Sequence, residues 1–231
     1  MSAKTEILAA VRAAIAQSQP AAPDPHVVRD YRFHAGSPAG SEAIVAEFVE
    51  ALEDYHARVA QVSSAEVPGA IDDMLEAAEA HSVVVPSGLP QEWAEAAGGQ
   101  LGRGRGRKRS APREVHTDSR EEPLDKEFLA GVNAVVTAAR TAISLSGTIV
   151  LDGEPDQGRR AITLLPDVHV CVVRASQVQG TVPEAVAILG EHPERPQTWV
   201  AGPSATSDIE LVRVDGVHGP RTLCVVVVTD A

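Results

Sequence analysis

The residues best suited to chemistry lie in one short stretch near the carboxyl end of the chain, GPSATSDIELVRVDGVHGPR at residues 202–221. It begins at Gly202, and glycine permits both a sharp turn and a close approach of the backbone to a ligand. Hydroxyl groups follow from Ser204, Thr206 and Ser207. Because hydroxyls donate and accept hydrogen bonds, the stretch is a candidate ligand-binding segment.

A helix is predicted to begin at Asp208, because Ser207 and Glu210 have the spacing of a capping box. Its sequence, IELVRV, follows at residues 209–214. The first turn of a helix presents backbone N–H groups without intrahelical partners, and these groups attract anions. A strand over 197–202, a glycine turn and a helix start therefore predict an anion site. In open α/β sheets, such sites lie beyond the carboxyl ends of the strands.

The second half of the stretch places His218 between Gly216 and Gly219 and ends at Arg221. A histidine titrates near neutral pH and is a candidate proton donor or acceptor. The planar fork of an arginine suits a carboxylate or phosphate. The alternative is purely structural: Ser207 caps the helix, and the arginine pairs with an acidic residue of that helix. The convergence of several polar side-chain types with three glycines favours the functional interpretation.

The elements before this stretch alternate between helices and strands, which predicts an α/β fold with a mostly parallel sheet and helices on both faces. Helices are expected at 41–56, 67–78, 90–97 and 183–192, and strands at 57–62, 82–86, 148–152, 197–202 and 222–228. The segment 124–132 begins as a helix, and 133–144 fits a helix or a strand. Residues 161–173 are predicted as one or two strands with a proline break.

Composition limits the classes of function. The chain of 231 residues is 44% hydrophobic but 3% aromatic, so small aliphatic side chains must fill the core. Its net charge of −12 argues against general affinity for nucleic acids or membranes. No run approaches the roughly 18–20 apolar residues of a membrane span, and no signal-peptide pattern is present. We therefore expect a cytoplasmic protein with a small anionic ligand.

The amino-terminal segment and a basic loop near the middle of the chain do not belong to the predicted α/β core. Residues 1–25 are predicted as an amphipathic helical arm with a linker, and the arm either packs on its own domain or forms a dimer or partner contact. Residues 26–231 are predicted as a single domain that contains a flexible, solvated basic loop at 98–113. Contact of this loop with an acidic surface, of the same chain or of a partner, is the alternative. Six basic residues and no acid occur in this loop, but no aromatic residue stands between them to stack on bases.

Metal and cluster chemistry have no sequence support. The two cysteines, Cys171 and Cys224, lie in apolar runs and are predicted to be inert buried thiols. Without a CxxC motif the chain is not expected to hold an iron–sulfur cluster, and no histidine cluster suggests a metal. His169 lies in an apolar strand and is predicted to be a core histidine. We therefore expect neither a metal nor a cofactor.

Three motifs together resemble the lactate-utilisation protein C family, also called LUD-domain proteins. The stretch 202–221 resembles the carboxyl-terminal motif of the family. SGTIVL at 146–151 resembles its TGT-strand motif, and ITLLPDVHVCVV at 162–173 resembles its LLP-x-x-H strand. The resemblance covers roughly 124–228 and adds Ser146, Gly147 and Thr148 to the candidate ligand-binding residues.

The resemblance implies a fold like that of ribose-phosphate isomerase, glucosamine-phosphate deaminase and coenzyme A transferases. It also implies a role in oxidising L-lactate to pyruvate beside two other subunits, one of which binds iron–sulfur clusters. This chain would be a subunit without clusters, and a homo-oligomer is also compatible with the resemblance.

Two departures from the family pattern limit what chemistry the resemblance can imply. Ala138, Ala139 and Arg140 replace a Gly-Ala-Asp segment, and Leu145 stands where the family often has glutamate. Leucine cannot act as the covalent nucleophile that glutamate provides in the related transferases. The remaining candidates for acid–base catalysis are Asp208, Glu210 and His218.

Two functions follow as hypotheses. The first is an accessory or ligand-binding subunit of an L-lactate oxidation system, without a redox cofactor of its own. The second is a free-standing enzyme that acts on an anionic sugar phosphate or an acyl thioester. Binding of nucleic acid through residues 103–109 is a weaker third hypothesis, which we do not expect to hold.

Overall fold

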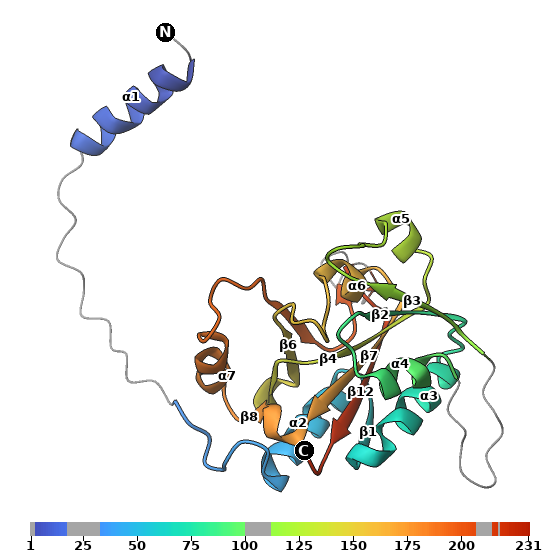
Figure 1. Cartoon of the computed structure of the whole chain (residues 1–231). Helices are drawn as coiled ribbons and strands as arrows, with labels where there is room; N and C mark the ends of the chain where they lie inside the picture. Colours follow the sequence, from blue (N-terminus) through green and yellow to red (C-terminus); the bar gives the residue numbers. More distant parts are fainter. Residues whose placement is uncertain (1–2, 18–32, 100–111, 207–213, 217) are drawn as a thin grey trace, which may run out of the picture. The chain divides into compact units, whose positions relative to one another are not determined.

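The computed structural model describes residues 3–17, 33–99, 112–206, 214–216 and 218–231 (Figure 1). The chain forms two compact units, Met1–Arg32 and Phe33–Ala231. In the first unit, helix α1 spans Ala3–Gln17, and none of its residues is buried. Its apolar side chains are exposed, with Ile7 and Ile15 at 62% and 65%. None of the helices in the described ranges is long and apolar enough to span a membrane.

The second unit is built on a six-stranded sheet in the order β1-β12-β7-β4-β2-β3, in which every pairing is parallel. Its strands are β1 Arg58–Val62, β2 Ser82–Pro86, β3 Glu114–Asp118, β4 Ala134–Ala138, β7 Val168–Arg174 and β12 Thr222–Val228. The predicted mostly parallel sheet is confirmed. Strand β3, at the edge, has no counterpart in the sequence prediction.

Helices cover both faces of this sheet, as predicted. Alternate residues of β7 point to opposite faces because successive side chains in a strand alternate. Val170 and Val172 belong to a core cluster with α3 (Val67–Ala77) and α4 (Gln91–Ala97). Figure 1 shows these two helices together beside the sheet. On the opposite face, Cys171 and Val173 pack in a cluster with α2 (Glu42–Asp54).

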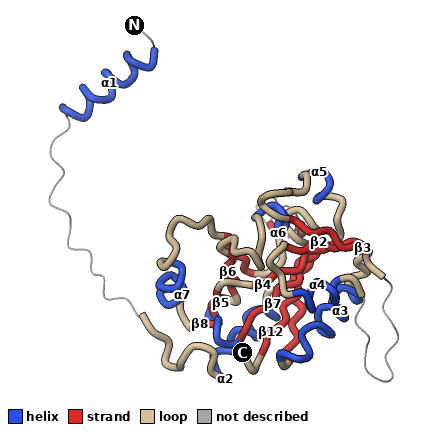
Figure 2. Tube along the Cα trace, viewed as in Figure 1, coloured by secondary structure: helices blue, strands red, loops and turns tan. Residues whose placement is uncertain are grey.

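A smaller sheet of four strands, in the order β8-β5-β6-β9, joins the face covered by α2 (Figure 2). Its strands are β8 Val178–Gln179, β5 Thr141–Ile143, β6 Thr148–Leu151 and β9 Thr198–Ala201. The pairs β5–β6 and β6–β9 are antiparallel. Further short elements are α5 Lys126–Leu129, α6 Arg160–Leu164, α7 Val182–Leu189, β10 Ala205–Thr206, β11 Val214–Asp215, and the 3-10 helices Ser64–Glu66, Ser144–Ser146 and Ala175–Gln177.

For residues 161–173 the alternative of one strand is confirmed, and that of two strands is wrong. The second half of this segment forms β7, and the first half is the short helix α6 rather than a strand. The hydroxyl of Thr163 donates a hydrogen bond to the carbonyl of Arg160 at 3.0 Å within this turn. Such local side-chain bonds favour a turn over an extended strand. The ambiguous segment 133–144 forms strands β4 and β5 and then enters a 3-10 turn.

Arg113 differs from the solvated loop predicted for 98–113. Its side chain is 3% exposed and donates a hydrogen bond at 2.8 Å to Asp72 of α3, which is equally buried. The other five basic residues of that loop lie outside the described residues.

The predicted burial of both cysteines is confirmed. Burial raises the pKa of Cys171 to about 12 and that of Cys224 to about 11. Because the thiolate is the reactive form, these thiols are unreactive near neutral pH.

Candidate ligand-binding site

The stretch 202–221 leaves the small sheet at the end of β9 and makes a tight turn at Gly202. This residue is buried and has φ +78°. A Cβ atom here would lie 2.7 Å from the Cβ of Tyr55. Both the backbone conformation and the contact therefore require glycine, as the sequence suggested.

Ser204 connects the two ends of the stretch. Its Oγ accepts a hydrogen bond from the backbone N–H of His218 at 3.0 Å. Its own N–H donates to the carbonyl of Pro220, and its carbonyl accepts from the N–H of Gly216, both at 2.8 Å. These bonds fix the loop that carries the histidine. They also use the Ser204 amide internally, so this amide is not available to an anion.

Gly202, Ser204, His218 and Gly219 line one hollow of about 350 Å³, which we call the signature hollow. Sequence reasoning missed several of its other lining residues: Arg160, Thr163, His169, Gln197 and Trp199. Arg160 begins α6, and His169 is the second residue of β7. These positions are far from the carboxyl-terminal motif in sequence, and only the fold brings them to it.

His169 forms the buried polar part of this hollow. His169 is 1% exposed, and its Nε2 lies 2.8 Å from the hydroxyl oxygen of Thr137 on β4. Burial lowers the pKa of His169 to about 4. The prediction of a hydrogen-bonded core histidine is confirmed, and the imidazole is neutral at physiological pH. The apolar residues on either side of His169 were the sequence signal for its burial.

Four other predicted site residues lie elsewhere. Arg221 does not line the signature hollow; its Nε is 3.5 Å from Asp167, and both side chains are about two-thirds exposed. Ser146, Gly147 and Thr148 form the turn into β6, where the two hydroxyl oxygens are 2.8 Å apart. They do not line the signature hollow either.

The centre of the predicted motif is not fully described. Thr206 belongs to β10, which pairs with β11. Ser207, Asp208 and Glu210 lie outside the described residues. Val214, the last residue of the predicted helix, belongs to strand β11 instead. The described ends of this segment therefore pair as two short antiparallel strands.

The position of the signature hollow differs from the expectation that a ligand lies at the carboxyl ends of parallel strands. His169 and Leu223 are the second residues of β7 and β12, so the hollow lies at the amino ends of these strands. The reason is that β9, which leads into the glycine turn, belongs to the small sheet and runs antiparallel to β6.

The signature hollow combines one guanidinium group with neutral hydrogen-bonding groups and an apolar wall. Arg160 supplies the positive charge, while Ser204 and His218 supply a hydroxyl and an exposed imidazole. Leu164 and Leu223 are apolar. This set suits a small anion with an apolar portion. Across the described parts of the chain, no three His, Cys, Asp or Glu side chains gather as metal ligands.

Comparison with known proteins gives the family. The model of the LUD domain matches residues 45–228. The chain belongs to the LUD domain family. Among its relatives in this family is the lactate utilization protein C of Deinococcus radiodurans, which is 43% identical over 98% of this chain and 95% of that protein. The lactate utilization protein C of Bacillus subtilis is 31% identical over 51% of this chain and 50% of that protein.

A solved structure supports the same assignment. A DUF162 family protein from Deinococcus radiodurans is 39% identical and matches with a TM-score of 0.64, over 80% of this chain and 96% of that one. The α/β architecture described above is therefore consistent with that of a solved relative. The LUD domain match includes both the signature hollow and the whole parallel sheet.

Proposed function

We propose that this LUD-domain chain is an accessory, ligand-binding subunit of an L-lactate oxidation system and has no redox cofactor of its own. The observation that carries the proposal is the 43% identity with a lactate utilization protein C over almost the whole length of both chains. The proposed partners are an iron–sulfur subunit and a second subunit, and the proposed location is the cytoplasm.

The signature hollow is the proposed ligand site. In this proposal, Arg160 pairs with the carboxylate of a small acid, because a guanidinium fork matches a carboxylate well. The hydroxyl of Ser204 and the imidazole of His218 donate further hydrogen bonds. The apolar wall at Leu164 and Leu223 contacts the carbon chain of the ligand. Asp208 and Glu210 stay candidates for proton transfer together with His218.

Growth of the organism that encodes the chain tests the role directly. A deletion strain should grow normally on pyruvate and fail to grow on L-lactate, because only the oxidation step before pyruvate is lost. The wild-type gene should restore growth. Equal growth of the deletion strain on both carbon sources would contradict the proposal.

Copurification tests the proposed partners. A tagged chain produced at its native level should bring down a protein with the visible absorption of iron–sulfur clusters, and the same tag without the chain is the control. Recovery of the chain alone would contradict the subunit role. Thermal stabilisation by a sugar phosphate or an acyl thioester, with growth on L-lactate intact, would instead favour a free-standing enzyme.

A further inference from the structure

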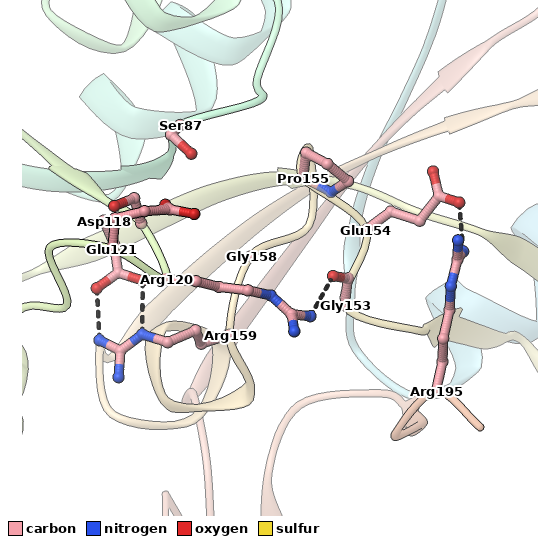
Figure 3. A pocket seen from close by; sticks show the side chains of 11 residues that line it. Ser87, Asp118, Arg120, Glu121, Gly153, Glu154, Pro155, Gly158, Arg159 and Arg195 are labelled. Atoms are coloured by element: carbon pink, nitrogen blue, oxygen red, sulfur yellow. Dashed lines mark hydrogen bonds and ion pairs between the residues drawn. The ribbon is translucent and has the colours of Figure 1, made fainter.

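A second hollow, of about 290 Å³, lies at the carboxyl ends of β2 and β3, where Figure 3 shows its side chains. Arg120, Arg159 and Arg195 reach it from three separate segments of the chain. We call it the arginine hollow. Its other lining residues include Ser87 directly after β2. Open α/β sheets bind ligands at this edge, but the LUD signature motif does not contribute to it.

The wall of the arginine hollow is tightly constructed. Gly88 donates a backbone hydrogen bond to the carbonyl of Pro155 at 3.0 Å, and a Cβ at position 88 would lie 2.4 Å from the Cβ of that proline. Gly158 has φ +72°, and a Cβ there would lie 3.0 Å from Pro86. The two glycines thus let the loop after β6 close against the end of β2.

Carboxylates already pair with two of the three guanidinium groups. Arg159 donates to Asp118, with Nε 2.9 Å from Oδ2. Arg195 donates to Asp152 at 3.0 Å and also to Glu154. These arginines hold the hollow together, and most of their charge is balanced.

Arg120 differs from its neighbours. It is exposed, and its guanidinium donates to the carbonyl of Gly153 at 3.0 Å (Figure 3). Among the described residues, no carboxylate forms an ion pair with it. Its guanidinium therefore carries a positive charge at the hollow that no described carboxylate pairs with.

We propose that the arginine hollow is a second binding site, for a small monocarboxylate that carries a hydroxyl or amino group beside the carboxylate. The guanidinium of Arg120 would take the carboxylate. Glu121 lines the same hollow, is exposed and would accept a hydrogen bond from the neighbouring group of the ligand.

The charge of the lining explains this choice of ligand. The lining contains three carboxylates, and the structure pairs Asp118 with Arg159 and Glu154 with Arg195. The third carboxylate, that of Glu121, forms no described ion pair with Arg120. A phosphate dianion would bring two negative charges close to these carboxylates, and like charges repel. A monocarboxylate needs only the guanidinium of Arg120, and its hydroxyl or amino group can then donate a hydrogen bond to Glu121. The lining therefore favours a hydroxy or amino acid over phosphate.

A third hollow, of about 200 Å³, lies between the two sites. It shares Arg120 and Arg159 with the arginine hollow, and Arg160 and Thr163 with the signature hollow. The third hollow therefore adjoins the arginine hollow through Arg159, directly before α6, and the signature hollow through residues of α6 itself. A second carboxylate site next to the third hollow goes beyond the proposed function. Only the choice of L-lactate as the first probe rests on that proposed function.

Nuclear magnetic resonance titration of the full chain locates the binding. L-lactate and L-alanine are the probes, with acetate and inorganic phosphate as comparisons. At least one of the two probes should shift the backbone amide signals of Gly153 and Gly158, which line the arginine hollow. Binding of that probe should be tighter than that of acetate, which lacks the donor, and tighter than that of phosphate.

Substitution of Arg120 then tests the assignment. Arg120→Gln should weaken binding at Gly153 and Gly158 about tenfold or more, as expected for loss of a hydrogen bond to a charged group. Arg58→Gln is the matched control, because Arg58 is also exposed and also bonded to a backbone carbonyl, that of Ala77. This control should bind like the wild-type chain.

Two results would overturn the site. One is that none of the probes shifts the signals of Gly153 and Gly158. The other is that Arg120→Gln binds as tightly as Arg58→Gln. Neither result affects growth of the deletion strain on L-lactate or the signals of Gly202 and Gly219 in the signature hollow, so failure of this site is distinct from failure of the proposed function.

Discussion

The hydroxyl oxygen of Thr137 lies 2.8 Å from Nε2 of His169, and both residues are almost completely buried, on the neighbouring strands β4 and β7. The same hydroxyl is 3.7 Å from the sulfur of Cys171. Because His169 is 1% exposed, water contributes little to stabilising a positive charge on its imidazole, and burial of a cation in such a place is unfavourable. The contact therefore holds a neutral histidine at the edge of the signature hollow.

Stability should depend on pH through His169. Its pKa is lowered from 6.5 to about 4 in the folded chain, so the unfolded state binds more protons below pH 6.5. Stability from this group is complete above pH 6.5 and is lost as the pH falls towards 4. We expect a loss of about 2 kcal/mol by pH 5. Urea unfolding at pH 7.5 and 5 should show this loss in wild type and a smaller one in His169→Gln; equal losses in both would contradict it.

The buried ion pair between Arg113 and Asp72 should be important for stability. Arg113→Met removes the guanidinium that donates to the buried carboxylate of Asp72, and breaking a buried ion pair costs about 3–5 kcal/mol. Arg221→Met is the control, because its pair with Asp167 has side chains that are 64% and 65% exposed. That change should cost less than about 1 kcal/mol. Denaturant unfolding measures both, and similar costs would contradict the assignment.

Two glycine substitutions should have opposite signs. Gly147 has φ +58°, and an added Cβ would lie 3.0 Å from the backbone of Ala51 in α2. Gly147→Ala should therefore destabilise the chain by about 1–2 kcal/mol. Gly69 lies in α3 with no atom within 4 Å of an added Cβ, so Gly69→Ala should stabilise it by about 0.5–1 kcal/mol. Thermal unfolding distinguishes the two, and a shift of the same sign would be inconsistent with this reasoning.

Removal of the Ser204 hydroxyl should loosen one side of its loop. Ser204→Ala deletes the acceptor of the His218 N–H group and should cost about 1 kcal/mol. Hydrogen exchange at the His218 amide should become faster. The Gly216 amide is an internal control, because its acceptor is the backbone carbonyl of residue 204. Unchanged exchange at His218 would show that this bond contributes little.

The sequence predicted the elements that have a strong local pattern. TLCVVVV at 222–228 forms β12, since a continuous run of apolar and β-branched residues fits a strand that is buried on both faces. The helical stripe that contains Phe48 and Leu52 likewise forms α2, with both side chains fully buried. A capping box of Ser63 and Glu66 begins the 3-10 turn before α3, which is the helix predicted over 67–78.

The elements and site residues that were missed depend on contacts distant in sequence. Strand β3, EVHTD, is polar and lies at the sheet edge, so its sequence has little apolar pattern to detect. Arg113 finds its partner 41 residues away. Arg160, His169 and Trp199 reach the signature hollow from α6, β7 and β9. No local periodicity predicts that these segments meet, because the order of the strands in the two sheets decides it.

The contact between Gly88 and Pro155 joins the two sheets of the domain, and this affects how easily they separate. Gly88 follows β2 of the large sheet, and Pro155 follows β6 of the small one. A molecule held in the arginine hollow touches segments of both sheets at once, for instance Ser87 and Gly153. Its binding free energy therefore opposes separation of the two sheets. The rate at which proteases cleave the chain would then fall as the cellular concentration of the bound molecule rises.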